Sequence, residues 1–156
     1  MSTVGLISDT HGLLRREALD ALAGSDFIVH AGDIGDHAIL ERLREIAPVT
    51  AVRGNNDIGP WAEAIAQTNF LDVKGTRFHV LHSVHDLSID PAADGVHVVV
   101  SGHSHRPSIQ MRAGVLFINP GSAGPRRFRL PISVASIAVG DGSLSPRLIE
   151  LSEGRP

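Results

Sequence analysis

The stretch TVGLISDTH, residues 3–11, decides the fold. Its apolar run with β-branched residues predicts a buried strand over residues 3–8, and this strand leads directly into Asp9 and His11. Two further apolar segments predict strands at residues 26–30 and 49–53. Between these segments, apolar residues recur at helical spacing and predict helices at residues 12–23 and 36–47. The alternation of strand and helix predicts a parallel sheet covered by helices.

The second half of the chain shows hairpin signals instead. Segments that alternate in polarity or are wholly apolar, separated by turns that contain glycine, predict strands at residues 70–74, 77–82, 96–100, 108–112, 115–119, 131–139 and 144–151. A short helix is expected over residues 58–66. We therefore expect mostly antiparallel strands in this half, and one domain spanning residues 1–156.

The composition is that of an ordinary soluble globular protein, with 42% hydrophobic and 20% charged residues. A net charge of −3 indicates no nucleic-acid-binding or anionic-membrane surface. The absence of cysteine excludes disulfides, thiolate metal sites and cysteine nucleophiles. The N-terminal residues lack the features of a signal peptide, and no apolar run is long enough to span a membrane. The expected location is therefore the cytoplasm.

The positions of the polar residues are the informative feature. Nine histidines occur, and neutral imidazole is the commonest metal ligand. Asp, His or Asn follows five of the predicted strands at its carboxyl end, namely Asp9 with His11, Asp33, Asn55, His82, and His103 with His105. In open α/β sheets, ligands bind beyond these ends. Each motif alone has an ordinary explanation as a cap or a turn, but unpaired charges gathered at one rim are costly unless a cation offsets them.

The motifs occur in the order Asp-x-His, Gly-Asp, Gly-Asn, His and Gly-His-x-His. In this series the sequence resembles the calcineurin-like metallophosphoesterases, over roughly residues 4–122. More narrowly, it is similar to a subfamily of small bacterial and archaeal phosphodiesterases in the runs HAGD (30–33), GNND (54–57), GHSH (102–105) and INPGS (118–122). The resemblance implies an α/β fold, a four-layer α-β-β-α sandwich of two mixed sheets, with a dinuclear metal site at the C-terminal edge of the strands.

The resemblance also implies a role for each polar residue. Asp9, His11 and His105 would bind a first metal ion, Asn55, His82 and His103 a second, and Asp33 would bridge the two. Two divalent ions about 3.5–4 Å apart share an anionic ligand and clamp both the attacking and the leaving oxygen. We expect manganese, with nickel, iron, zinc and cobalt as alternatives, because imidazole with carboxylate suits all of these. A metal-bridging hydroxide would then hydrolyse a small phosphate ester, which we expect to be a diester.

Two positions depart from the family pattern. Asn56 stands where many members have a histidine that assists the transition state and the leaving group. We assign Asn56, with Asp33, to catalysis and Asn56 also to substrate binding, although an amide cannot give up a proton at neutral pH. Ser83 replaces a usual glycine, and His85 follows it. His85 is either a replacement general acid or an ordinary loop histidine.

Other polar residues have plainer interpretations. His30 is expected to be buried near its strand end or to support a ligand. His37, His79 and His97 are expected on ordinary surfaces or satisfied by hydrogen bonds. Asp57 is expected to cap a turn or orient a ligand.

Alternatives to the phosphodiesterase remain open. One is a phosphomonoesterase or nucleotide phosphatase. Another is a metal-binding scaffold for protein interactions, because the same small family is similar to a subunit of the retromer sorting coat. The complete set of predicted ligands argues against a purely scaffolding role. A homo-oligomer also remains open. The basic cluster at residues 126–129 is either a solvated loop or a contact for a substrate anion.

Overall fold

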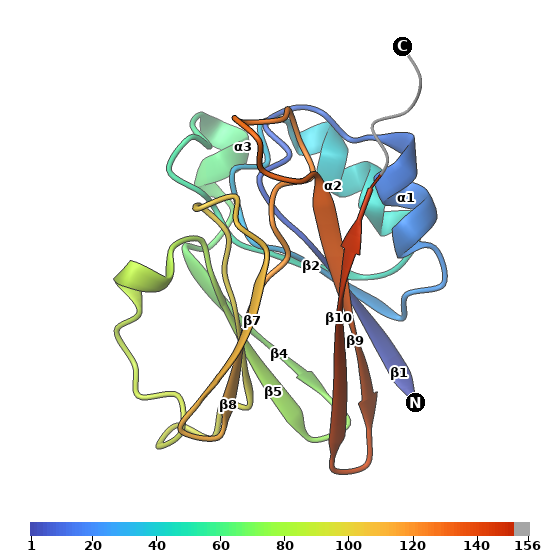
Figure 1. Ribbon diagram of the computed structural model, residues 1–156. Coiled ribbons are helices and arrows are strands. Elements are labelled where there is room, and N and C mark those ends of the chain that lie inside the picture. Colours follow the sequence, from blue (N-terminus) through green and yellow to red (C-terminus); the bar gives the residue numbers. More distant parts are fainter. Residues whose placement is uncertain (152–156) are drawn as a thin grey trace.

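The computed structural model describes residues 1–151, in which two five-stranded sheets face each other (Figure 1). The first sheet has the order β10-β9-β1-β2-β3 and consists of β1 (Ser2–Ile7), β2 (Phe27–His30), β3 (Val49–Ala51), β9 (Ser133–Gly140) and β10 (Ser143–Glu150). The second has the order β4-β5-β6-β8-β7 and consists of β4 (Thr68–Val73), β5 (Thr76–Leu81), β6 (Val98–Val100), β7 (Ser108–Arg112) and β8 (Val115–Asn119). The expectation of two mixed sheets is confirmed.

Parallel strands form the centre of each sheet. β2 pairs in parallel with both β1 and β3, and the hairpin of β9 and β10 adds to β1 in antiparallel fashion. In the second sheet, β6 pairs in parallel with β5 and β8, whereas β4 and β7 are antiparallel edge strands. The expectation of mostly antiparallel strands in the second half therefore holds for the hairpins but is wrong for the central strands. The parallel strands of both sheets end at the upper edge in Figure 1.

Alternate side chains of the central strands fill the space between the sheets. On β1, Val4 and Leu6 are fully buried, and they belong to one apolar cluster with Val80 of β5 and Val98 of β6. This spacing follows from the two-residue period of a strand, which points every second side chain to the same face. The core therefore fixes the register of both sheets, and with it the positions of the residues that follow each strand.

Helices cover the outer face of the first sheet. α1 (Arg16–Leu22) and α2 (His37–Arg44) contribute Leu22 and Leu40 to a second cluster with Ile28 of β2. The Asp36 carboxylate accepts a hydrogen bond from the Ala38 amide and caps α2. α1 is shorter than predicted, and α3 (Pro60–Glu63) is a single turn that begins with proline. None of the helices within residues 1–151 is long and apolar enough to cross a membrane.

A loop covers the outer face of the second sheet. Within the described chain, the only helix in the loop between β5 and β6 is the 3₁₀ turn η1 (Val84–Asp86). Leu87 and Ile89 of this loop pack against Leu81 and Val99 of the sheet. The fourth layer of the sandwich is thus made of irregular chain, and η1 lies close to the edge where β5 ends.

Candidate metal centre

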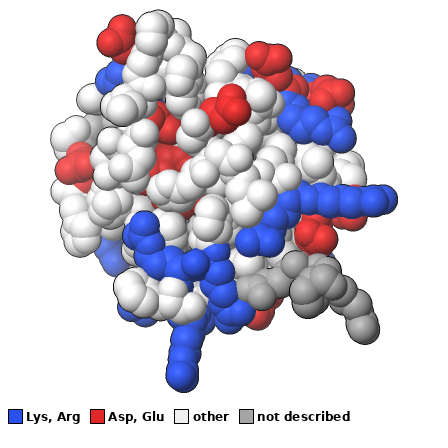
Figure 2. Space-filling model, turned by 90° about the horizontal axis from the view of Figure 1, so that it is seen from above, with Lys and Arg blue, Asp and Glu red and all other residues white. Residues whose placement is uncertain are grey.

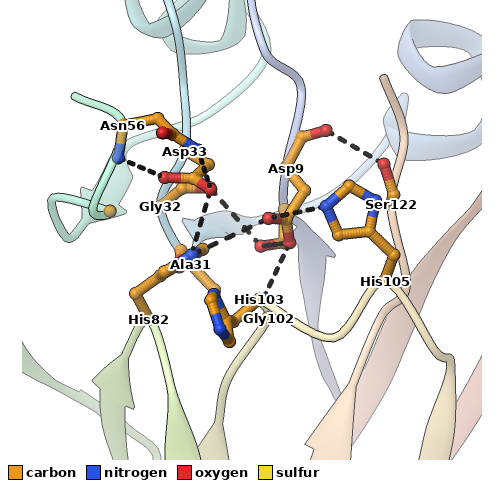
Figure 3. Close-up of polar contacts among 12 residues, drawn as sticks. Asp9, Ala31, Gly32, Asp33, Asn56, His82, Gly102, His103, His105 and Ser122 are labelled. Carbon is orange, nitrogen blue, oxygen red and sulfur yellow. Dashed lines mark hydrogen bonds and ion pairs between the residues drawn. The ribbon is translucent and has the colours of Figure 1, made fainter. Parts of the chain in front are cut away.

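The predicted ligands lie where the strands of both sheets end (Figure 3). Five of them adopt a left-handed backbone, with φ values of 55° for Asp9, 46° for His11, 55° for Asp33, 71° for His103 and 62° for His105. This region is uncommon for residues other than glycine, and such strain gathers at functional sites. Among residues 1–151, only three other non-glycine residues share it. The unfavourable backbone is therefore concentrated in the ligand loops.

Carboxylate oxygens and imidazole nitrogens converge in the centre of this edge. Asp9 Oδ1 lies 3.7 Å from His11 Nε2, 3.8 Å from His82 Nε2 and 3.4 Å from His105 Nε2. Asp33 Oδ2 lies 3.6 Å from His11 Nε2 and 3.2 Å from His82 Nε2. Two groups of three possible ligands result, Asp9 with His11 and His105, and Asp9 with Asp33 and His82. Each carboxylate thus lies close both to a histidine predicted to bind the first ion and to a histidine predicted to bind the second.

Several of these atoms are buried without a partner. Asp9 Oδ1, His11 Nε2 and His82 Nε2 have no hydrogen bond to any described residue. Burial of such polar atoms is costly unless something else binds them. A set of carboxylate oxygens and imidazole nitrogens is one that first-row divalent cations accept. The residues present therefore fit a metal ion.

The orientation of His82 supports this conclusion. Its Nδ1 lies 2.7 Å from the carbonyl oxygen of Ala31, so Nδ1 carries the hydrogen and donates it (Figure 3). The lone pair is then on Nε2, which faces Asp33. A backbone acceptor on the far nitrogen is the usual device that fixes the tautomer of a ligating histidine.

Asn55 and His103 lie at the rim of the centre. The ring centroid of His103 is 5.2 Å from that of His82, and the centroids of His11 and His105 are 5.4 Å apart. The four rings therefore lie in two pairs, and the division of the pairs between two ions stays a prediction. Asn55 is exposed and lines a groove of 680 Å³ together with His82 and His103. Its role as a ligand stays a prediction.

Charges in the centre shift one another's protonation. Burial raises the pKa of Asp9, but the nearby rings of His105 and His11 and the hydrogen bond from Ser8 outweigh burial and hold this pKa below its usual value. Burial also raises the pKa of Asp33, but the nearby ring of His82 and the hydrogen bond from the Asn56 amide outweigh burial, so the net pKa of Asp33 is lowered.

The histidines respond in the opposite direction. The nearby carboxylate of Asp9 raises the pKa of His11. Burial lowers the pKa of His82, but the contact with Asp33 outweighs it and the net pKa is raised. Both rings hold a proton more tightly than usual, so an incoming cation must displace protons.

His30 links two of the ligand loops. The Gly32 amide donates to His30 Nδ1 at 3.1 Å, so Nε2 carries the hydrogen and donates to Thr10 Oγ1 at 3.0 Å. The Thr10 hydroxyl in turn donates to the Ile34 carbonyl at 2.8 Å. Burial lowers the pKa of His30 to about 4, which keeps the ring neutral. The expectation of a buried, supporting histidine is confirmed.

Asp57 links a further pair of loops. Its carboxylate accepts hydrogen bonds from the amides of Ile34 at 3.1 Å, Gly35 at 2.9 Å and Gly54 at 2.9 Å. The loop after β2, which carries Asp33, is thereby fixed to the loop after β3. Asp57 therefore caps the turn that begins at Gly54, which is one of the two expected roles, and its orientation of a ligand stays a prediction.

Ser8 was not predicted to support a ligand, and two residues of the run at 118–122 also hold the ligand loops. Ser8 donates to Asp9 Oδ2 at 2.7 Å, and Ser122 donates to the Asp9 carbonyl at 3.0 Å. Asn119 donates to the Gly102 carbonyl at 3.0 Å and so fixes the start of the GHSH loop. In the sequence, Ser8 and Asn119 each stand at the end of an apolar strand, and this position is the signal that marks them as candidate supporting residues.

The two catalytic candidates, Asn56 and His85, lie beside residues predicted to bind the second metal ion or to bridge the two ions. The Asn56 backbone amide donates to Asp33 Oδ1 at 2.9 Å, and its side-chain amide donates to Asp33 Oδ2 at 3.1 Å. His85 is exposed on η1 and lines the same groove as Asn55 and His103. Both candidates are therefore close to predicted ligands.

The remaining histidines take no part in the centre. His37 lies 3.0 Å from Glu41 on the exposed side of α2, and His97 Nδ1 accepts from the Arg77 amide at 3.0 Å. The surface interpretation is wrong for His79, which is 3% exposed. Its ring packs against Phe70 with 4.6 Å between centroids, and burial lowers its pKa.

Comparison with known proteins assigns the family. Residues 2–142 match the calcineurin-like phosphoesterase superfamily domain. The chain belongs to this superfamily. A protein named probable metallophosphoesterase from Methanocaldococcus jannaschii is 32% identical over 167 residues, which cover 96% of this chain and 82% of that protein. Phosphodiesterase YfcE of Escherichia coli K12 is 31% identical over 145 residues, which cover 74% and 76%. The resemblance found in the motifs is confirmed, and the chain is a metal-dependent phosphoesterase by family.

Solved structures of the superfamily share the fold. Vps29 of Chaetomium thermophilum has a TM-score of 0.84 at 20% identity, with 99% of this chain and 91% of that chain covered. A structure described as a novel archaeal phosphodiesterase has a TM-score of 0.77 at 21% identity, with 94% and 99% covered. At these identities the likeness shows the fold alone, and it confirms the metallophosphoesterase sandwich.

Proposed function

We propose that this calcineurin-like phosphoesterase hydrolyses phosphate diesters with the help of two divalent metal ions, of which manganese is the one expected. The observation that carries the proposal is the set of buried, unpartnered atoms on Asp9, His11 and His82, of which Asp9 and His11 have a strained backbone. Such an arrangement has little use in a structural core. It fits a site whose partner is a cation and a small phosphate ester.

The seven predicted ligands divide between the two ions. Asp9, His11 and His105 hold the first, Asn55, His82 and His103 hold the second, and Asp33 is shared. Asp33 suits the shared position because its Oδ2 lies within 3.6 Å of His11 Nε2 and 3.2 Å of His82 Nε2. Divalent ions at such a site supply Lewis acidity and lower the pKa of water.

The two carboxylates of the site bear on the choice between a diester and a monoester. Nearby imidazole rings and hydrogen-bond donors keep the pKa values of Asp9 and Asp33 low, so both carboxylates stay ionised at neutral pH. A diester brings one fewer negative charge than a monoester beside them. Repulsion by the carboxylates is correspondingly smaller for the diester.

Asn56 and His85 define how the leaving group departs. One N–H of the Asn56 amide donates to Asp33, and the second can donate to a phosphoryl oxygen. The amide gives up no proton, so a proton for the leaving oxygen has to come from elsewhere. His85 is exposed in the groove beside the second half and is the candidate acid.

A substrate panel tests the proposal. Metal-free protein is loaded with manganese, nickel, iron, zinc or cobalt and assayed with bis(p-nitrophenyl) phosphate, p-nitrophenyl phosphate and cyclic nucleotides. We expect no activity in the presence of chelator and a preference for the diester after manganese is restored. A preference for the monoester would favour the phosphomonoesterase. Tight metal binding without turnover of any ester would favour the interaction scaffold.

A further inference from the structure

The loop at residues 125–130 carries an unusual side chain. Phe128 is 88% exposed, and its φ of 55° places it in the left-handed region. An exposed aromatic ring contributes no burial to folding, and a positive φ is unfavourable for a bulky residue. Arg127 and Arg129 flank it, and both are exposed. Folding alone gives no reason for this combination.

The loop begins directly against the metal centre. The Ala123 amide donates to the Ser8 carbonyl at 3.0 Å, and Arg15 Nη2 donates to the Gly124 carbonyl at 3.3 Å. Gly124 packs so closely that a Cβ there would overlap the carbonyl oxygens of Asp9 and Thr10. The chain therefore leaves the first half of the centre with a fixed direction, and the arginines and Phe128 follow within a few residues.

Positive charge surrounds this side of the centre. Arg106 directly follows the predicted ligand His105. Together with Phe128 and Arg129 it lines an open groove of 670 Å³. Figure 2 looks onto the edge with the strand ends and shows Lys and Arg side chains gathered along one side of it.

We propose that Arg106, Phe128 and Arg129 form a subsite for nucleotide diesters. It deepens the proposed function and rests on it. A nucleobase stacks on the Phe128 ring, and a phosphate other than the scissile one binds the arginines. Aromatic rings accept any base by stacking, and arginine forms bidentate hydrogen bonds to phosphate. Hydrolysis adds water across the scissile P–O bond and gives a monoester and an alcohol, so no further reactant is needed.

Three substrates with one leaving group test the subsite. They are methyl p-nitrophenyl phosphate, the p-nitrophenyl ester of thymidine 5′-phosphate, and the same nucleoside ester with an added 3′-phosphate. Because p-nitrophenolate leaves in each case, ratios of kcat/KM report the binding of the base and of the second phosphate. We expect kcat/KM for the nucleoside ester, divided by kcat/KM for the methyl ester, to fall about tenfold in Phe128→Ala. The gain from the 3′-phosphate should be lost in Arg129→Gln and Arg106→Gln.

Matched variants control for exposure and charge. Met111→Ala removes another exposed apolar side chain on β7, and Arg147→Gln removes another exposed arginine on β10. Both should leave the ratios unchanged, and melting temperatures should show that all variants are folded. Unchanged ratios in Phe128→Ala and Arg129→Gln would overturn the subsite.

A binding measurement separates the subsite from the proposed function. If the wild type cleaves no p-nitrophenyl ester with any metal, the proposed function fails by itself. Calorimetric titration with thymidine 3′,5′-bisphosphate then tests the subsite without turnover. Binding that weakens about tenfold in Phe128→Ala and is unchanged in Met111→Ala supports it. Equal binding in both, or no binding to the wild type, refutes it.

Discussion

The two halves of the metal centre differ in how firmly the chain holds them. Around the first predicted ion, Asp9 and His105 are almost fully buried, and the loop at residues 122–124 is hydrogen-bonded to the backbone of the strand end. Around the second, His103 and Asn55 are exposed and face a groove. The first half is preorganised and the second is open. We infer that the first half binds its ion more tightly and that the second exchanges with solvent and admits substrate.

The shared carboxylate gives the largest expected effect, because its loss breaks both halves. Asp33→Asn should lower kcat by at least ~10²–10³-fold, since one charge-stabilising element of a two-metal site is removed. Steady-state assays with metal analysis measure it. His37→Ala and His97→Ala are the controls and should be near neutral, because neither ring lies in the centre. Wild-type turnover with both metals in Asp33→Asn would show the assignment to be wrong.

Removal of one histidine from each half tests the difference directly. His105→Ala should weaken binding of the tighter ion by at least ~10²-fold, beyond the loss that supporting residues produce. His103→Ala should leave one tight ion per chain and lose the other. Calorimetric titration of metal-free protein gives the affinity and the number of ions. An equal loss of the tight ion in both variants would mean that the halves are equivalent.

The link between the loops is a third place to test. Asp57→Ala removes the acceptor for three backbone amides and should lower the free energy of unfolding by ~1–3 kcal/mol. Metal affinity or activity should fall ~10–100-fold, although Asp57 binds no ion in our assignment. Asp36→Ala is a matched control, because the Asp36 carboxylate caps α2 through the Ala38 amide, and its loss should cost ~1 kcal/mol with activity retained. Chemical denaturation and metal titration provide both numbers.

The pH dependence of metal binding should sharpen the comparison. The pKa values of His11 and His82 are raised above 6.5 by the carboxylates. Each protonated ring stabilises the metal-free fold at low pH, and this contribution is lost as pH rises through the raised pKa. Metal binding expels the same protons. The affinity for the metal ion should therefore rise with pH by up to ~10-fold per pH unit for each ring, at pH values below the raised pKa. An affinity that does not change between pH 6 and pH 8 would contradict the shifts.

The smallest effect concerns the leaving group on the open side. A plot of log rate against leaving-group pKa for aryl diesters should be steep, because Asn56 donates no proton. The slope should flatten in Asn56→His, where an imidazolium can act as general acid. A flat slope in the wild type that steepens in His85→Ala would instead identify His85 as the acid.

The sequence predicted the strands and the convergence of the polar residues that follow them, but not the backbone conformation of these residues. Apolar runs located the strands, and polar residues at their ends located the centre, because both signals are local. The parallel pairing of β5, β6 and β8 was missed, since long-range pairing leaves no trace in local periodicity. The burial of His79 was missed as well, because a histidine in a strand reads as polar. The left-handed conformations of the ligands have no local signal either, since Asp and His adopt ordinary backbone elsewhere.

Those left-handed conformations set function against stability. Glycine tolerates a positive φ at little cost, so a change of His103 to glycine would relieve strain in the metal-free chain. In the absence of metal, the His103→Gly variant should therefore have a higher melting temperature than the wild type. With metal present the order reverses, because bound ions stabilise only the chain that keeps its ligands. A lineage that lost access to the metal would drift toward glycine here and keep the sandwich without the chemistry.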